Sequence, residues 1–214
     1  MNSSPPDGGP VLRACGDTAW LMEMLDNEEV HRWTAAVRAA GVMGVTDVVP
    51  GLNTLLVVID PALTTQAALR ASLRELRPGS VVAGDTDHHV IDVCYDGEDI
   101  DEVARLTRLA PEDVIDAHTG TPWRVAFCGF VPGFSYLVGG DPRLRVPRRN
   151  EARTRVPAGA VAIAGEFSSI YPRVSPGGWQ LLGHTEATLW DAELDPPAVL
   201  LPGAVVEFRD VTGR

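Results

Sequence analysis

The chain has 214 residues, of which 45% are hydrophobic, and its formal net charge is −11. This length allows one large domain or two small ones, and the negative charge argues against a nucleic-acid partner, because phosphate binding requires a broad basic surface. No apolar run approaches the ~18 residues of a membrane span and the N-terminus lacks a signal-peptide pattern, so we expect a cytoplasmic protein with no membrane partner.

The first part of the chain predicts a small α+β domain. Residues 1–10 are polar and rich in Pro and Gly, and we expect a disordered tail. A helix capped by Asn27 is expected to end at Gly41, and a second helix is expected to open at Thr64 or Thr65 and end before Pro78. Alternating apolar residues predict strands at 11–15, 19–24, 47–50, 54–59 and 90–95. The order β, α, β, β, α, β indicates a ferredoxin-like sandwich over residues 11–95.

A helical pair and a run of short strands follow. Helices expected at 100–109 and from Pro111 are interpreted as a linker, residues 96–122, and their many acidic residues argue against a helix-turn-helix that binds DNA. Short strands separated by Pro and Gly turns are expected at 124–127, 136–138, 160–164, 180–182, 187–190 and 205–208. We expect them to close into an all-β barrel over residues 123–214.

Within this region, residues 129–185 are rich in Gly, Pro, Arg and aromatic residues and are the most informative part of the chain. Six arginines lie between Arg143 and Arg155, which suits a small carboxylate or phosphate ligand, although a solvated loop is equally compatible with the pattern. Arg148, Arg153 and Arg155 are the candidate anion ligands. Tyr136, Tyr171 and Trp179 are candidates for the wall of a pocket or for half-buried core positions.

Further residues are expected to shape this site or to act in it. His184 is a candidate acid or base, but the sequence indicates no partner for it, and a structural role is the stronger alternative. The residues expected to shape the cavity are Phe130, Pro132, Gly133, Phe134, Pro157, Gly159, Gly165, Pro176, Gly177 and Gly178.

Several chemistries are excluded or disfavoured. All 18 basic residues are arginine, so this chain can supply no P-loop lysine, no Schiff base, no biotin attachment and no lysine-activated amidase serine. The three cysteines, Cys15, Cys94 and Cys128, are far apart and without CxxC spacing, and we expect neither a disulfide nor a zinc site among them. A metal site at His88 and His89 is rejected because alternation sends the two rings to opposite faces, so no metal site is predicted.

The ordered motifs FVPGFSYL (130–137), RTRVPAG (153–159), VAIAG (161–165), IYP (170–172) and SPGGW (175–179) resemble the allophanate hydrolase subunit 1 family. That family includes the B subunit of bacterial ATP-dependent 5-oxoprolinase and inhibitors of histidine kinases of the KipI type. It is also similar to part of the carboxyltransferase region of urea carboxylase. The resemblance implies an N-terminal α/β domain followed by a C-terminal cyclophilin-like β-barrel.

The resemblance also implies that this chain is part of a composite enzyme. Its expected partners are a protein like allophanate hydrolase subunit 2, or the C subunit of the 5-oxoprolinase, and a third oxoprolinase subunit. The expected reaction is ATP-dependent opening of 5-oxoproline to glutamate, with ATP bound by the complex and by no motif of this chain. Two alternatives stay open: an inhibitor that docks on a histidine kinase, and a component of a urea or amide carboxylase with a biotin carrier in trans.

This chain departs from the family pattern at three places. The usual GGQTGIYP reads GEFSSIYP at 165–172, so Phe167 stands where a glutamine side chain is usual. His184 replaces an arginine that often follows LIG, and Glu186 replaces a common proline. If that glutamine binds substrate in relatives, Phe167 cannot supply its donor and acceptor, which would change activity or substrate.

Overall fold

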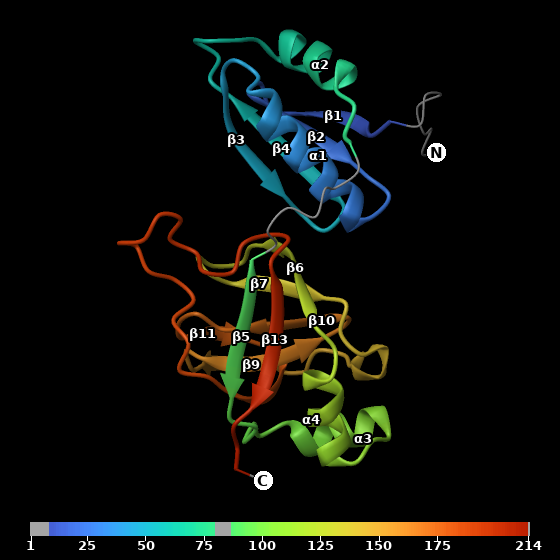
Figure 1. Ribbon diagram of the computed structural model, residues 1–214, viewed down its shortest axis with the longest axis vertical. Helices are drawn as coiled ribbons and strands as arrows, with labels where there is room; N and C mark the ends of the chain where they lie inside the picture. Colours follow the sequence, from blue (N-terminus) through green and yellow to red (C-terminus); the bar gives the residue numbers. More distant parts are fainter. Residues whose placement is uncertain (1–8, 80–86, 214) are drawn as a thin grey trace. The chain divides into compact units, whose positions relative to one another are not determined.

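The computed structural model describes residues 9–79 and 87–213, and the chain divides into two compact units, Met1–Asp85 and Thr86–Arg214 (Figure 1). Each unit has a hydrophobic core of its own, and the expected α+β class is confirmed. The predicted tail lies outside the described residues, apart from Gly9 and Pro10.

The N-terminal unit is a four-stranded antiparallel sheet with two helices on one face. Its strands are β1 (Val11–Cys15), β2 (Ala19–Glu23), β3 (Val45–Pro50) and β4 (Thr54–Ile59), in the order β1-β2-β4-β3. Its helices are α1 (Asn27–Ala40) and α2 (Gln66–Glu75). Alternate residues of β4, namely Leu55, Val57 and Ile59, are buried and pack in one core with both helices, because successive side chains of a strand point to opposite faces.

The starts of the two helices follow from side-chain caps. Helix α2 begins after Thr65, whose hydroxyl accepts a hydrogen bond from Ala68 N at 3.2 Å, as expected. The cap predicted for α1 is wrong by one residue, because Asp26 accepts from Glu29 N at 2.8 Å. The Asn27 amide instead donates to Leu52 O at 3.0 Å and joins the helix to the loop before β4.

The last strand predicted for the N-terminal sandwich, 90–95, belongs to the other unit. Strand β5 (His88–Val93) pairs in parallel with β13 (Val205–Asp210), and β1 occupies the sheet edge beside β2. The assignment of this strand to a ferredoxin-like sandwich over 11–95 is therefore wrong. Strand periodicity identifies an element but does not determine its partner, and β5 buries Ile91 and Val93 in the core of the second unit.

The second unit is built on a seven-stranded sheet in the order β12-β9-β10-β7-β6-β13-β5. Its further strands are β6 (Trp123–Cys128), β7 (Ser135–Val138), β9 (Ala160–Ala164), β10 (Phe167–Ile170) and β12 (Gln180–His184), and a separate pair is formed by β8 (Arg153–Val156) and β11 (Ser175–Gly177). The two end strands meet at a bridge in which Cys94 N donates to His184 O and His184 N donates to Cys94 O, each at 2.9 Å. The sheet is thus nearly closed into a barrel.

The strand predictions for this unit hold with two differences. Strands β8, β10 and β11 were not expected, because they are three or four residues long and lie among turn residues. The strand expected at 187–190 is wrong, since only an isolated bridge between Trp190 and Ala198 forms there. A short 3₁₀ turn, η1 (Pro142–Leu144), opens the segment 143–155, which carries six arginines and is called the basic loop.

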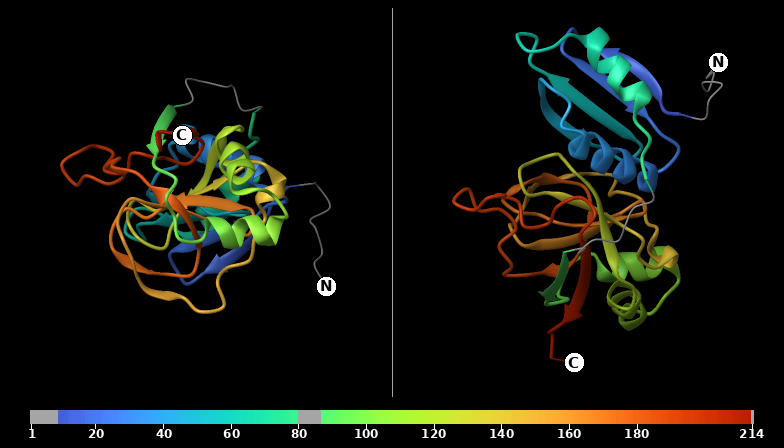
Figure 2. Two further views of the ribbon diagram at one scale, coloured as in Figure 1. Left: turned by 90° about the horizontal axis from the view of Figure 1, so that it is seen from below. Right: turned by 45° about the horizontal axis from the view of Figure 1, so that its top comes forward.

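Helices α3 (Ile100–Thr107) and α4 (Pro111–Thr119) belong to the barrel unit and do not form a linker. They lie side by side against the sheet (Figure 2), and Val103, Val114 and Ile115 are buried in the same core as the strands. The linker interpretation of residues 96–122 is wrong, because the apolar residues of both helices are buried in the core of the barrel unit. No helix within the described ranges is both long enough and apolar enough to cross a membrane.

The α3–α4 core contains a fully buried histidine. His118 Nδ1 lies 2.7 Å from the Tyr95 hydroxyl and its Nε2 lies 2.8 Å from Ser168 Oγ, while the ring stacks on Phe208 at 4.4 Å between centroids. Burial lowers the pKa of His118 from 6.5 to about 3, because the charged imidazolium would lose its hydration. This ring is therefore a neutral, hydrogen-bonded part of the core.

Candidate anion-binding site

An aromatic cluster covers the face of β9 opposite the barrel core. The alternating residues Val161 and Ile163 enter the main core, whereas the small side chains of Ala160, Ala162 and Ala164 belong to a second core on the other face. Five rings pack in this second core with the alanines, and Phe127 contacts two of them. The six are called the aromatic cluster: Phe127, Phe134, Tyr136, Phe167, Tyr171 and Trp179. Small residues on a strand leave the space that large rings require.

Phe134 lies at the centre of the aromatic cluster. Its ring is 5.1 Å from Tyr136, 5.3 Å from Tyr171 and 5.6 Å from Trp179, each at a steep angle typical of edge-to-face contacts. Phe130 adds a further ring at 5.3 Å, although its side chain is exposed and its φ is 69°. The predicted wall residues Tyr136, Tyr171 and Trp179 are therefore brought together.

The Tyr171 hydroxyl is the polar centre of this cluster. Burial raises the pKa of Tyr171, and the opposing influences are a hydrogen bond with the Trp179 backbone and the positive charges of Arg148 and Arg153. A Cβ added at Gly177 would overlap this hydroxyl, so only glycine lets the β11 backbone pass beside it. The phenol stays protonated at neutral pH and can donate a hydrogen bond beside two cations.

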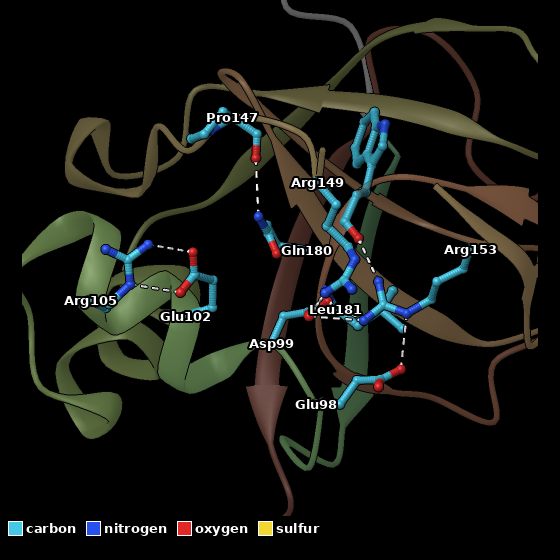
Figure 3. Close-up of polar contacts among 10 residues, drawn as sticks. Glu98, Asp99, Glu102, Arg105, Pro147, Arg149, Arg153, Gln180 and Leu181 are labelled. Carbon is cyan, nitrogen blue, oxygen red and sulfur yellow. Dashed lines mark hydrogen bonds and ion pairs between the residues drawn. The ribbon is translucent and has the colours of Figure 1, made fainter. Parts of the chain in front are cut away.

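A buried carboxylate holds the second half of the basic loop (Figure 3). Asp99 is 2% exposed and accepts from Arg149 Nη1 at 2.5 Å, from Arg153 Nη2 at 2.8 Å and from Leu181 N at 2.7 Å. Arg153 also donates to Glu98 at 3.0 Å. A buried charge is costly unless it is paired, and this network compensates the Asp99 charge with two guanidinium groups.

The remaining arginines of the loop divide into paired and unpaired side chains. Arg143 is paired with Asp141 at 2.6 Å and Arg145 with Glu166 at 2.8 Å. Arg148 and Arg155 are exposed and have no ion-pair partner within residues 9–79 and 87–213. Of these two cations, Arg148 is the one whose charge acts on the Tyr171 hydroxyl.

An open groove of about 430 Å³ adjoins this site. Its lining includes Pro147, which precedes Arg148, and Phe167, whose ring is 5.6 Å from Tyr136. Glu166 lies on the same rim and is held by Arg145. Phe167 thus places an apolar wall at the position where the family pattern usually has a glutamine.

The other residues expected to shape the site lie around it in different ways. Gly133 has φ +80° and packs against Trp190 and Pro172 without room for a side chain. Gly159 and Gly165 also have positive φ, Gly178 has only ordinary contacts, and Pro132, Pro157 and Pro176 are exposed. Their positions agree with turn geometry, and their influence on a ligand stays a prediction.

His184 lies away from the aromatic cluster. It ends β12, opposite Ala160 of β9, and belongs neither to the aromatic cluster nor to the core beneath it. Its Nδ1 lies 2.9 Å from Asp96 Oδ1, so it has the partner that the sequence did not reveal. The two residues are 88 positions apart, and no local pattern connects them.

Sequence reasoning also missed three residues of the site. Asp99 lies among many acidic residues of a helical segment, so the sequence did not single it out as an ion-pair partner. Arg149 was not separated from the neighbouring arginines as a residue that binds within the fold. Gln180 is 2% exposed, donates to Pro147 O at 3.2 Å and has a buried Oε1 without a hydrogen-bond partner (Figure 3). The available signal was alternation in β12, which places a polar side chain on the same side as the apolar Leu182.

Comparison with known proteins gives a consistent set of relatives. The family model "Carboxyltransferase domain, subdomain C and D" matches residues 10–200. The 5-oxoprolinase B subunit of Escherichia coli O157:H7 is 35% identical over 201 residues, which are 90% of this chain and 92% of that protein. The 5-oxoprolinase B subunit of Bacillus subtilis (strain 168) is 45% identical over 127 residues, 58% of this chain and 53% of that protein.

Larger proteins contain a similar region. The crystal structure of TTHA0988 is similar with a TM-score of 0.81 and 34% identity over 95% of this chain, which spans 41% of that chain. Urea amidolyase of Saccharomyces cerevisiae is 33% identical over 121 residues, 53% of this chain and 6% of that protein. The chain therefore matches about half or less of TTHA0988, of urea amidolyase and of the Bacillus protein, and nearly all of the Escherichia coli protein.

Proposed function

The chain belongs to the carboxyltransferase domain family, subdomain C and D, and on that premise we propose that it is the B subunit of an ATP-dependent 5-oxoprolinase. The complex would convert 5-oxo-L-proline, ATP and water into L-glutamate, ADP and phosphate. This chain would contribute a small-anion site, and a second barrel protein would complete that site. The proposal assigns the hydrolase activity to the complex and none to the isolated chain.

One observation carries the proposal. The charge of Arg148 acts on the Tyr171 hydroxyl, the rings of Tyr171 and Trp179 both pack on Phe134, and Phe167 of the same aromatic cluster lines an open groove. 5-Oxoproline has one carboxylate on a small lactam ring, and a guanidinium pairs with a carboxylate through two parallel hydrogen bonds. The ring of the substrate would contact the aromatic cluster, and the Tyr171 hydroxyl would donate to a carboxylate or lactam oxygen.

The proposal assigns ATP binding and substrate binding to different proteins of the complex. This chain has no lysine, so it cannot form the phosphate cradle of a P-loop, and we assign ATP binding to a partner protein of the complex. Arg149, Arg153 and Asp99 would hold the loop that carries Arg148 rather than touch substrate. The acid or base role expected for His184 is not part of this site, because His184 is hydrogen-bonded to Asp96 and lines a different groove.

Reconstitution tests the proposal. The chain would be purified alone and together with its neighbouring gene products, and ADP release would be measured with and without 5-oxoproline. We expect 5-oxoproline-dependent ATP hydrolysis only in the complete mixture. Absence of that activity from every mixture, with all proteins folded by circular dichroism, would contradict the proposal.

The similarity to urea amidolyase favours one second candidate, a carboxyltransferase component of a urea or amide carboxylase. Such a complex would consume ATP in response to urea and bicarbonate and would need a biotin carrier from another chain, because this one has no lysine. Stimulation by urea with no response to 5-oxoproline would favour it. The third alternative, docking on a histidine kinase, predicts that the chain captures a kinase in pull-down and lowers its autophosphorylation.

A further inference from the structure

The edges of the barrel meet along a seam formed by residues 94–99 and 181–184. Cys94 and His184 are directly paired by two backbone hydrogen bonds of 2.9 Å, and Gly97 N donates to Leu182 O at 3.1 Å. A Cβ at Gly183 would overlap the Cys94 carbonyl, so the two segments touch through their backbones. The relative positions of side chains at the seam are therefore fixed by the closure of the barrel.

Three metal-binding side chains converge at this seam. One ligand atom each of Cys94, Asp96 and His184 lies within 4.8 Å of the others. Within the described ranges this is the one group of three or more His, Cys, Asp and Glu side chains with such spacing. The thiol is free and half-buried, and the carboxylate and imidazole are partly exposed and hydrogen-bonded to each other at 2.9 Å.

We propose that Cys94, Asp96 and His184 form a binding site for a divalent metal ion of the zinc class. A thiolate, an imidazole and a carboxylate form a mixed set that suits zinc, whereas magnesium and calcium prefer oxygen ligands alone. Metal–ligand bonds of about 2.0–2.3 Å in a tetrahedron place ligand atoms about 3.5 Å apart. The Asp96 Oδ1 and His184 Nδ1 atoms, 2.9 Å apart, would separate by about 0.6 Å, and the widest separation, within 4.8 Å, would close by at most about 1.3 Å. Rotation of the partly exposed Asp96 and His184 side chains can supply both changes.

The surroundings leave a coordination position open. A groove of about 460 Å³ borders the site, and its lining includes Cys94, His184, Asp92 and Glu186. Asp92 is engaged by Arg209 at 2.5 Å, while Glu186 is exposed and has no ion-pair partner among the described residues. Three protein ligands with water or Glu186 in the fourth position is the arrangement of an accessible zinc site. This site is separate from the aromatic cluster, and the inference does not depend on the proposed function.

Cobalt(II) binding to the full chain tests this inference. The experiment uses a Cys15→Ser/Cys128→Ser background, which keeps Cys94 as the single thiol, under reducing conditions. We expect one cobalt ion per chain, a thiolate-to-cobalt charge-transfer band, and displacement of cobalt by stoichiometric zinc. On the same background, Cys94→Ser should abolish the band, and Asp96→Ala and His184→Gln should each weaken zinc binding at least about tenfold in competition with a chromogenic chelator.

The controls separate loss of the site from loss of the fold. His88→Gln changes an exposed histidine paired with Glu207 on the same sheet and should leave zinc affinity within about twofold. Circular dichroism and thermal melts establish that each variant is folded, and Asp96→Ala, at an exposed position, keeps the test usable if Cys94→Ser unfolds. Absence of the charge-transfer band, or equal zinc affinity in the background protein and in folded Asp96→Ala and His184→Gln, would overturn the inference.

Discussion

Both carboxylate oxygens of Asp99 accept hydrogen bonds of 2.8 Å from a single nitrogen of Arg153, 54 residues later in the chain. Asp99 directly precedes α3, and Arg153 begins β8, so this ion pair joins the helical pair to the basic loop. The side chains are 3% and 14% exposed, which limits competition from water. The loop that carries Arg148 is thus held from within the fold.

Replacing Asp99 by asparagine should destabilise the barrel unit. Asp99→Asn leaves the guanidinium groups of Arg149 and Arg153 without their shared countercharge, and breaking a buried ion pair costs about 3–5 kcal/mol. Urea denaturation monitored by tryptophan fluorescence measures the loss. The matched change is Glu98→Gln, at a carboxylate that is 68% exposed and also bonds Arg153, which should cost less than about 1 kcal/mol. Equal stability of the two variants would contradict this account of the network.

Two adjacent glycines should respond differently to an added methyl group. Gly177→Ala places its Cβ on the Tyr171 hydroxyl, whereas Gly178→Ala meets only the Ala152 Cβ at 3.6 Å. Overpacking of this kind costs about 1–3 kcal/mol, so Gly177→Ala should lower stability and raise the KM of the complex for its substrate. Gly178→Ala should be near neutral in both measurements. A Gly177→Ala variant as stable and active as Gly178→Ala would show that the Tyr171 hydroxyl is not fixed by the β11 backbone.

His118 should make stability depend on pH below neutrality. The folded ring takes up a proton only near pH 3, whereas the unfolded chain takes it up near 6.5, so the unfolded state binds more protons between these values. The contribution of His118 is complete above pH 6.5 and is lost as pH falls through this window, by at most about 1.4 kcal/mol per pH unit. Urea denaturation from about pH 7 to about pH 4 should show a steeper loss for the wild type than for His118→Phe.

The protonation state of His118 can also be observed directly. NMR of the imidazole in the folded protein should show a neutral ring throughout the range from about pH 7 to about pH 4, because Tyr95 and Ser168 hold it in the core. A ring that titrates near its ordinary value in the folded state would remove the basis for the predicted slope.

Much of the local structure could be predicted from the sequence. Apolar periodicity and turn residues located α1, α2 and most strands of both sheets, because burial and turn chemistry act over a few residues. The pairing of β5 with β13 could not be predicted, since their residues lie 117 positions apart and many strand pairings satisfy the same pattern. The predicted ferredoxin-like arrangement is wrong because β5 pairs with β13 and is not a strand of the N-terminal sheet.

The candidate site could also be predicted only in part, because its motifs are local but its ion pairs join residues far apart in the sequence. Motif spacing pointed to Tyr136, Tyr171 and Trp179, which the fold brings into one aromatic cluster, and to Arg148, whose charge acts on Tyr171. The partners of the other arginines depend on long-range closure of the barrel. Asp99, which engages Arg153, is provided by the segment before α3, and its charge could not be assigned a partner from local sequence.

The proposed role of Arg148 gives the most direct test of the function. In the reconstituted complex, steady-state kinetics of 5-oxoproline-dependent ATP hydrolysis would be compared for the wild type, Arg148→Ala and Arg143→Ala. The control arginine is 58% exposed and paired with Asp141 outside the aromatic cluster. Loss of charge-assisted hydrogen bonds of about 1.5–3 kcal/mol should raise the KM for 5-oxoproline at least about tenfold in Arg148→Ala, with Arg143→Ala near the wild type. An unchanged KM in an active Arg148→Ala complex would contradict the assignment of this surface as the anion site.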